Sequence, residues 1–396
     1  MEKLFIKSRE KVKLVKTGFI RYLMNEIDWN DRMIGIKGAR GVGKTTLLLQ
    51  IIKTHLQNEK VLYITLEDLY FTENSLYTLA EDFVNHDGRY LVIDEVHRYP
   101  DWAKELKLIY DDFNSLRIIF TGSSILDIIQ ARADLSRRAV VYTMQGLSFR
   151  EYLNFSKNLN LPKYDLTQIL ENHLTISDEI IAGINPIPVF AEYLKIGYYP
   201  YFIENESTYL YKLSEVVNQV LSTDLTVIKK ILPDAIPRIR KLLYVISNSV
   251  PFKPNVSKLS EISDISRNTL ITYLQYLEEA NILNLLHSDS TGTGYLRKPE
   301  KIYLENTNLQ YAISDKEPES GNLRETFFIN QIKKSNHITF SQTGDFKVNE
   351  KYFFEIGGKN KTRKQIAGVE SSFIAADNIQ YGFENKIPLW LFGFLY

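Results

Sequence analysis

The sequence contains no cysteine. This absence excludes disulfides, thiolate metal sites and cysteine nucleophiles, and it is typical of proteins from a reducing compartment. An apolar run of about 18 residues, long enough to cross a bilayer, is also missing, and charges interrupt the apolar residues of the N-terminal stretch 1–7. We therefore expect no membrane span, no signal peptide and a cytoplasmic location.

The sequence also has no net charge of either sign. The 396 residues include 48 basic and 48 acidic side chains, so no overall charge attracts nucleic acid or anionic lipid, and binding to either requires a local patch. Apolar residues, by contrast, are plentiful. They make up 44% of the chain, which at this length predicts two to four domains with buried cores.

The first third of the chain alternates short apolar runs with helical stretches. This alternation is typical of a parallel sheet with crossover helices, so the predicted fold class is α/β. The predicted strands are 33–37, 61–66, 90–93, 117–120 and 140–142. The predicted domains are an α/β core at 1–147, a helical lid or connector at 148–232, a segment with helix-turn-helix spacing at 233–314 and a mixed α and β domain at 315–396.

A glycine-rich stretch follows the first predicted strand and precedes a predicted helix, which is the context of a P-loop. Its glycines allow positive φ angles, so backbone N–H groups and the helix N-terminus can point at phosphates. Lys44 then faces β- and γ-phosphate charge, and the hydroxyl of Thr45 is a Mg²⁺ ligand. The predicted ligands are ATP and Mg²⁺, and the predicted binding residues are Gly38, Ala39, Arg40, Gly41, Val42, Gly43, Lys44, Thr45 and Thr46.

A second part of the same site is predicted at the end of the strand 90–93, which leads into Asp94 and Glu95. Two acids at the end of a buried strand are costly unless a site uses their charge. We expect Asp94 to organise Mg²⁺ with its water shell, and Glu95 to act as general base on the attacking water. Solvated acids at an exposed strand end are the alternative.

The strand 117–120 leads into Thr121 and Ser123, at the edge of the sheet where α/β proteins bind ligands. Either hydroxyl is a candidate for orienting the water or sensing the γ-phosphate. Capping of a helix by Ser123 or Ser124 is the alternative.

Three arginines, Arg132, Arg137 and Arg138, come next in the chain. An arginine that reaches a γ-phosphate, in the same chain or in a neighbouring one, stabilises charge in the transition state, and the alternative is a solvated basic helix end. The stretch 94–97 also resembles an Asp-Glu-x-His helicase motif. Helicases of that class carry two P-loop-like domains, and no second one is predicted after residue 142, so His97 is expected to be structural or a partner for Glu95.

Together these motifs make the chain resemble a family of prokaryotic AAA-type ATPases whose P-loop core is fused to a C-terminal region of unknown function. The matching stretches are 38–46, 92–98 with Trp102, 120–124, 135–138, 147–153 and 197–200. In that family a glycine usually precedes the arginine that matches Arg138. Here Arg137 takes its place, so either arginine is a candidate for facing the nucleotide. The resemblance implies ATP binding, a winged-helix segment and a C-terminal fold like that of restriction endonucleases.

Residues 257–280 have helix-turn-helix spacing, with a turn capped by Ser266 and with Leu270, Leu274 and Leu277 on one face of the second helix. Predicted strands at 282–286 and 301–304, joined by a turn at 292–294, would form a wing. This face is only mildly basic, so DNA binding and a protein-contact or architectural role both stay open. Its candidate DNA contacts are Arg267, Asn268, Thr272, Gln275, Arg297 and Lys298, with Asp264, Glu278 and Glu279 close by.

Glu325, Asp345 and Glu355 have the order and strand context of a metal-dependent nuclease core, in which two carboxylates hold Mg²⁺ and a lysine activates water. Gly357 stands where that lysine is expected, and Lys359 replaces it only if the chain bends back. We predict a nuclease-like domain without nuclease activity. The basic run Lys359, Lys361, Arg363 and Lys364 is either a solvated face or a contact for a phosphate backbone or an acidic partner.

Two functions are therefore compared. In the first, the chain is an ATPase whose nucleotide state switches the contacts of its C-terminal half with a protein partner or with a second copy. In the second, it is a DNA-binding regulatory or defence module that uses ATP as a signal.

Overall fold

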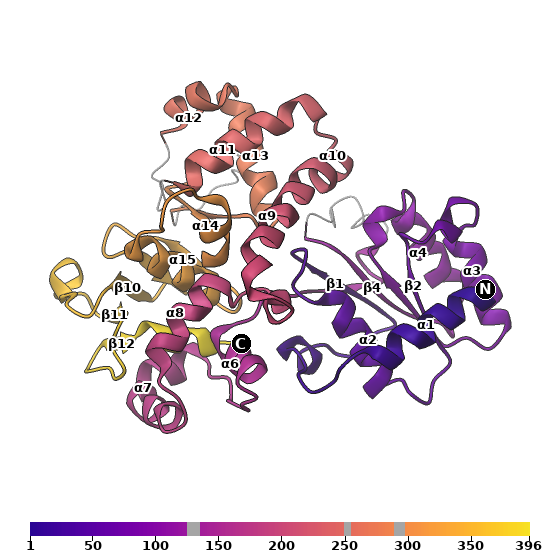
Figure 1. Cartoon of the computed structure of the whole chain (residues 1–396), viewed down its shortest axis with the longest axis horizontal. Helices are drawn as coiled ribbons and strands as arrows, with labels where there is room; N and C mark the ends of the chain where they lie inside the picture. Colours follow the sequence, from indigo (N-terminus) through magenta and orange to yellow (C-terminus); the bar gives the residue numbers. More distant parts are fainter. Residues whose placement is uncertain (125–134, 249–254, 289–297) are drawn as a thin grey trace. The chain divides into compact units, whose positions relative to one another are not determined.

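The computed structural model describes residues 1–124, 135–248, 255–288 and 298–396. The chain forms two compact units, Met1–Gln145 and Gly146–Tyr396 (Figure 1). Three features of the sequence, Arg132, the turn at 292–294 and Arg297, lie outside the described residues. Among the helices that are described, none combines the length and the apolar character needed to cross a membrane.

The first unit is built on five parallel strands in the order β2-β3-β4-β1-β5. This sheet confirms the predicted α/β class, and every strand begins at its predicted residue. Its strands are rich in Val, Ile and Leu because helices cover both faces. The strands are β1 (Met33–Gly38), β2 (Val61–Thr65), β3 (Tyr90–Asp94), β4 (Arg117–Ser123) and β5 (Val140–Thr143).

Among the described residues of this unit, helices α1 to α4 pack around the sheet (Figure 1). Helices α3 (Leu76–Asn85) and α4 (Trp102–Asp112) pack together and share one buried apolar cluster with β2, β3 and β4. Helix α2 (Lys44–Thr54) contacts β1, β3 and β4, and α1 (Glu2–Leu14) contacts β2 and α2. Because the strands are parallel, the carboxyl ends of β1, β3 and β4 meet at one edge, which is where α/β proteins bind ligands.

The second unit begins with the helical segment that the sequence predicted. Ser148 caps its first helix by accepting a hydrogen bond from the backbone N–H of Glu151 (3.2 Å). A π-helical turn at Val220–Asp224 joins the last two helices. The helices are α6 (Phe149–Ser156), α7 (Leu166–Ile181), α8 (Pro186–Ile196), α9 (Tyr209–Gln219) and α10 (Leu225–Ile228).

Helix α11 (Ile236–Ser247) leads into the elements expected of a helix-turn-helix and a hairpin. Ser266 caps the second of the paired helices, as predicted, and the three leucines on its inner face are buried. The strands of the hairpin are antiparallel. These elements lie where they were predicted, while their identity as a winged helix stays a prediction. They are α12 (Val256–Ser263), α13 (Arg267–Glu279), β6 (Leu283–Leu286) and β7 (Lys301–Leu304).

A second sheet of five strands completes this unit, in the order β12-β11-β10-β9-β8. Strands β8 to β10 pair antiparallel, and β10 to β12 pair parallel. Phe328 of helix α15 packs against Phe346, Phe354 and Phe392, which gives the sheet an aromatic core. Helix α14 (Thr307–Ile313) precedes this part, which contains α15 (Ser320–Ile332), β8 (Ile338–Phe340), β9 (Phe346–Val348), β10 (Tyr352–Gly357), β11 (Ser372–Ala376) and β12 (Lys386–Pro388).

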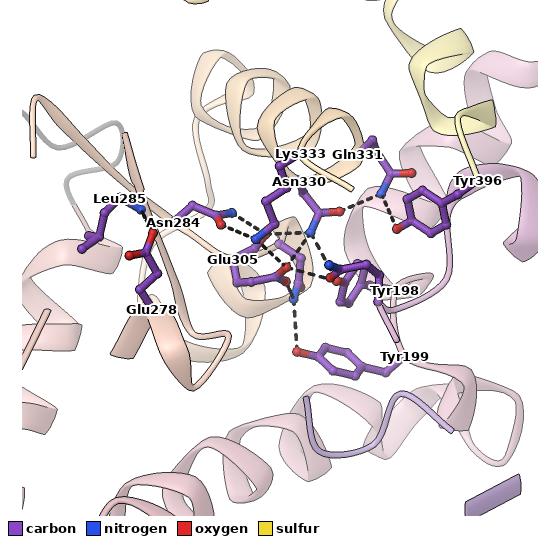
Figure 2. A network of polar contacts seen from close by, with 12 residues as sticks. Tyr198, Tyr199, Glu278, Asn284, Leu285, Glu305, Asn330, Gln331, Lys333 and Tyr396 are labelled. Carbon is purple, nitrogen blue, oxygen red and sulfur yellow. Dashed lines mark hydrogen bonds and ion pairs between the residues drawn. The ribbon is translucent and has the colours of Figure 1, made fainter. Parts of the chain in front are cut away.

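The core of the second unit also contains a buried polar network around Glu305, whose side chain is fully buried (Figure 2). Its carboxylate accepts hydrogen bonds from the amides of Asn306 and Asn330 (2.9 Å each), and Lys333 forms an ion pair with it (3.2 Å). The hydroxyl of Tyr198 also donates to it (3.2 Å). The network therefore ties the 197–200 stretch, which the sequence singled out, to α14 and α15.

Candidate functional site

The loop between β1 and α2 has the backbone that the sequence predicted. Gly41 and Gly43 have φ angles of 85° and 99°, in a region that favours glycine. A Cβ atom on Gly38 would lie only 2.4 Å from the carbonyl oxygen of Met144, so only glycine fits there without a shift of the backbone. The loop therefore has the conformation in which N–H groups can surround an anion, at the N-terminus of an 11-residue helix.

Lys44 lies over this loop and is 5% exposed. Its ammonium donates to the carbonyl oxygens of Gly38 (3.0 Å) and Ala39 (3.1 Å). These carbonyls compensate the buried charge only partly, because an ammonium binds an anionic oxygen more strongly than a neutral one. An incoming phosphate is therefore a better partner for Lys44 than the loop itself.

Asp94, at the end of β3, is buried and receives three hydroxyl donors from three different elements. Thr45 of α2 (2.7 Å) and Tyr63 of β2 (2.9 Å) donate to its Oδ2, and Thr121 of β4 donates to its Oδ1. Burial raises the pKa of the Tyr63 hydroxyl, and the Asp94 charge raises it further, so this hydroxyl stays a donor. The structure thus brings Thr45 and Asp94 together as expected, and it adds Tyr63.

Glu95 has a strained backbone, with a φ angle of 57° at a non-glycine residue. Its N–H donates to the hydroxyl oxygen of Thr121 (3.1 Å), while its side chain keeps 20% of its surface exposed. Burial raises the pKa of the Glu95 carboxyl, and the nearby positive charge of Lys44 acts in the opposite direction. Glu95 is therefore a partly exposed acid whose carboxyl is influenced by the charge of Lys44.

His97 lies between Glu95 and the end of β4. The backbone N–H of Ser123 donates to its Nδ1 (3.2 Å), and its Nε2 is 3.3 Å from Oε2 of Glu95. Burial lowers the pKa of His97 to about 3, with further lowering by the charges of Arg98, Lys44 and Arg40. At neutral pH the contact with Glu95 therefore involves an uncharged imidazole and is no ion pair.

The two hydroxyl residues predicted on β4 differ in their surroundings. Thr121 is fully buried, and its hydroxyl joins Asp94 to the backbone of Glu95, so it supports the acids rather than reaching the water. Ser123 is 8% exposed and uses its backbone N–H for His97. The alternative of a helix cap at Ser123 or Ser124 concerns a stretch that extends beyond the described residues.

Arg138 lies far from the P-loop of its own chain. Its guanidinium forms a two-pronged ion pair with Asp111 in the last turn of α4 (2.7 and 2.8 Å). It comes just before β5, where Val140 pairs with Ile34 at the start of β1, whereas the P-loop follows the other end of β1. Arg138, and with it the exposed Arg137, therefore lies at the amino edge of the sheet, and the P-loop lies at the carboxyl edge.

A buried arginine that the sequence motifs did not predict supports the P-loop from outside. Arg21 is 5% exposed and donates to the carbonyl oxygens of Val42 (2.6 Å) and Gln145 (2.8 Å). It precedes the first strand, in a stretch without a recognisable pattern. Like Tyr63, it is assigned by its contacts alone, and no signal in the sequence indicates it.

In the second unit, lysines form ion pairs with the three carboxylates that were predicted for a nuclease core. The ammonium of Lys301, on β7, lies 3.0 Å from Glu325 and 3.3 Å from Asp345. Lys361 forms an ion pair with the buried Glu355. Across the described part of the chain, no group of three or more Asp, Glu or His side chains is arranged to hold a metal ion.

The bend after Glu355 brings back a different lysine from the one considered in the sequence. Lys359 is exposed, whereas Lys361 folds over Gly357, where a Cβ atom would lie 2.6 Å from its side chain. Arg363 donates to the hydroxyl of Ser372 (3.0 Å). The run 359–364 is therefore no uniform basic surface, since Lys361 and Arg363 have partners within the unit.

Two parts of the chain match known families. Residues 30–153 match a family described as an AAA domain, and residues 187–320 match a family described as a domain of unknown function. The first match covers the P-loop, the acids of β3 and all five strands. Residues 30–153 are thus similar to an AAA domain, and residues 187–320 are similar to a domain of unknown function.

The chain is 28% identical, over 256 residues, to an uncharacterized protein of Methanocaldococcus jannaschii, a match that covers 61% of this chain and 53% of that protein. It therefore spans about half the length of this curated relative. Two solved structures are also similar. AMPPCP-bound DnaA from Aquifex aeolicus has 14% identity, a TM-score of 0.26 and coverage of 69% of this chain and 86% of its own. PCH-2 of C. elegans has 20% identity, a TM-score of 0.24 and coverage of 40% and 44%.

Proposed function

We propose that this chain binds ATP with Mg²⁺ through residues 38–46 and hydrolyses it. The observation that carries the proposal is the convergence of Lys44, Thr45, Asp94 and Glu95 at the carboxyl edge of one parallel sheet. The match of residues 30–153 to an AAA domain supports it. In this site the P-loop N–H groups and Lys44 bind the phosphates, which requires Lys44 to exchange two carbonyl partners for phosphate oxygens.

The residues at the site suit Mg²⁺. Thr45 and Asp94 offer hard oxygen ligands whose atoms already lie 2.7 Å apart. At nucleotide sites Mg²⁺ binds one or two protein oxygens together with phosphates, rather than a cage made of protein alone. Thr45 would be the direct ligand, and Asp94 would hold a ligated water. Bound Mg²⁺ supplies positive charge to the phosphates during transfer.

Glu95 is the proposed general base. It is the more exposed acid of the pair, with 20% of its side chain accessible, whereas Asp94 is buried and accepts three hydroxyl donors. Its raised pKa makes it a stronger base than an ordinary carboxylate. Lys44 stabilises the charge that develops on the transferred phosphoryl group.

Arg138 is proposed to act on the nucleotide of a second copy of the chain. Its place at the amino edge of the sheet keeps it from its own P-loop, and the ion pair with Asp111 keeps it at the surface of the unit. A neighbouring chain that presents its P-loop to this edge would receive the guanidinium. ATP binding would then be coupled to self-association, and the nucleotide state would change the contacts of the C-terminal half with its partners.

Two variants test the proposal. Lys44→Ala should lose detectable binding of a fluorescent ATP analogue, because the charge opposite the phosphates is gone, while the fold survives. Glu95→Gln should keep that binding, but its rate of phosphate release should fall by about 100-fold or more, because an amide does not accept the proton of water. Normal nucleotide affinity in Lys44→Ala would overturn the binding site. Phosphate release at the wild-type rate in Glu95→Gln would remove Glu95 as the base.

A groove in the second unit favours nucleic acid as a second candidate ligand. It has a volume of about 730 Å³ and lies at the N-terminal ends of α12 and α13, where Arg267, Asn268 and Lys298 line it beside Glu300. Two cations against one acid give a modest attraction for phosphate. A mobility shift of a random duplex should weaken in the double variant Arg267→Ala/Lys298→Ala and stay unchanged in Lys241→Ala, an exposed lysine of α11. Equal shifts in all three proteins would exclude this groove.

A further inference from the structure

His97 has no role yet in the proposed site, in which the P-loop binds phosphates and the acid pair serves Mg²⁺ and water. Its ring is nearly buried, with 4% of the side chain exposed, and it lies three residues after Asp94 in the short 3-10 helix Val96–Arg98. Its two nitrogens face two different elements of the site. Nδ1 faces the backbone N–H of Ser123 at the end of β4, and Nε2 faces the carboxylate of Glu95.

The hydrogen bond from Ser123 determines which nitrogen of the neutral ring carries the proton. A backbone N–H can only donate, so Nδ1 must accept and cannot itself carry a hydrogen. The proton of the neutral imidazole is therefore on Nε2, which lies 3.3 Å from Oε2 of Glu95. An N–H group thus lies near the carboxylate, but the two groups are not aligned as a hydrogen bond, and Nε2 has no hydrogen-bond partner among the described residues.

We propose that His97 is a positioning residue for Glu95. Its Nε2–H, whose tautomer is set by the backbone of Ser123, is the donor that would hold the carboxylate once a rotation aligns the two groups. This inference rests on the proposed ATPase function. The two contacts form a chain from the end of β4 through His97 to Glu95, so the position of the proposed base depends on the strand that ends at Ser123. The low pKa of His97 agrees with a ring that stays neutral and keeps this donor.

The need for such a support follows from the backbone of Glu95. Its φ angle of 57° differs from that of an extended strand, and its N–H donates to the hydroxyl oxygen of Thr121. The side chain of Glu95 is 20% exposed, so packing alone does not enclose it. A donor on one oxygen leaves the other oxygen available for water. Misplacement of a catalytic group by about 1 Å can cost about 100-fold in rate.

Three variants separate this role from a merely structural one. His97→Ala should lower kcat by about 10- to 100-fold, with the affinity for a fluorescent ATP analogue within about threefold of wild type. His97→Gln should keep kcat within about threefold of wild type, because its amide nitrogen can reach the position of Nε2. His86→Ala, at an exposed histidine on the same unit, is the matched control and should behave as wild type.

The outcomes are distinct. An unchanged or faster His97→Ala enzyme, or equal losses in the Ala and Gln variants, would overturn the proposal while leaving ATP hydrolysis intact. If wild type itself released no phosphate, the proposed function would fail instead. The inference about His97 would then be decided by ¹⁵N NMR of the histidine side chains, with His97 assigned by its loss in His97→Gln. A proton on Nε2 supports the proposal, and a proton on Nδ1 overturns it.

Discussion

Asp94 and Glu95 are neighbours in the chain, yet their surroundings give them different chemistry. Asp94 is buried under hydroxyl groups from three elements, which fixes both of its oxygens. Glu95 turns out of the strand with a positive φ angle and keeps its carboxylate accessible. The carboxylate of Asp94 is therefore fixed and suited to organising a cation, whereas that of the adjacent Glu95 is less constrained and suited to accepting a proton.

His97 makes the first unit sensitive to acid. Its pKa is about 3 in the folded chain and 6.5 when unperturbed, so below pH 6.5 the unfolded chain takes up a proton that the folded chain excludes. The associated stability is therefore complete above pH 6.5 and is lost as the pH falls toward 3. At pH 5 the loss amounts to about 2 kcal/mol.

The measurement is the drop in melting temperature of the first unit between pH 7 and pH 5. This drop should be smaller in His97→Gln than in wild type, because glutamine takes up no proton. His86→Gln should keep the wild-type drop, since this side chain is largely exposed. An equal drop in all three proteins would show that His97 is protonated in the folded chain.

At the scale of secondary-structure elements, the sheet separates Arg138 from the P-loop by the length of β5 and β1. Arg138→Ala should therefore lower phosphate release by about 100-fold or more only at protein concentrations that allow self-association, with little change in nucleotide affinity. The test is the concentration dependence of phosphate release per chain. In wild type it should rise with concentration, and in Arg138→Ala it should stay flat.

Arg137→Ala is the matched control for this prediction. Arg137 is exposed and adjacent, so it has the same charge at nearly the same place. If Arg137→Ala shows the loss and Arg138→Ala does not, the arginine that reaches the γ-phosphate is Arg137, one residue earlier than the resemblance implies. If neither variant changes the rate, both arginines are surface residues.

A second prediction for elements concerns the hairpin strand β7, which places Lys301 between Glu325 and Asp345. Asp345→Ala and Glu355→Ala should leave ATP hydrolysis unchanged and remove no nuclease activity, because ammonium groups hold the carboxylates where a metal ion would need them. Plasmid and linear DNA incubated with Mg²⁺ or Mn²⁺ should stay intact. Cleavage by wild type that disappears in Asp345→Ala would contradict this, and Lys301 would then be the next residue to replace.

The elements also show what the sequence can predict. The first residues of all five strands of the first sheet could be predicted from the sequence, because buried parallel strands are continuous apolar runs bounded by turns. The P-loop and the acid pair were readable because their residues are adjacent in the chain. Arg21, Tyr63 and Lys301 were not, since each acts on a partner from a distant segment, and nothing in their own neighbourhood distinguishes them.

The whole molecule has two compact units, Met1–Gln145 and Gly146–Tyr396. The division into four domains stays a prediction. The helical segment, the hairpin and the second sheet pack together in the second unit, partly through the network around Glu305 (Figure 2). Helical spacing and turn residues reveal elements, but they do not reveal which elements share a core, because buried polar contacts have no periodic signature.

This network gives a prediction for the stability of the second unit. Lys333→Met should cost about 3 kcal/mol or more, because it leaves the carboxylate of Glu305 buried with amides and a hydroxyl but without a compensating charge. Chemical denaturation, followed by a probe in the second unit, measures the change. Lys241→Met removes an exposed lysine and should cost less than about 0.5 kcal/mol. Equal stability of the two variants would show that the ion pair contributes little.

The network around Glu305 joins residues that the ribosome makes at different times. Tyr198 donates to Glu305, and Asn330 donates to Tyr198 from 132 residues further along the chain. At about 5–20 residues per second, the ribosome makes Asn330 about 7 to 26 seconds after Tyr198. During that interval Tyr198, Tyr199 and the helices around them lack their buried partners. We therefore expect the nascent second unit to expose aromatic surface during this interval, until α15 has been made.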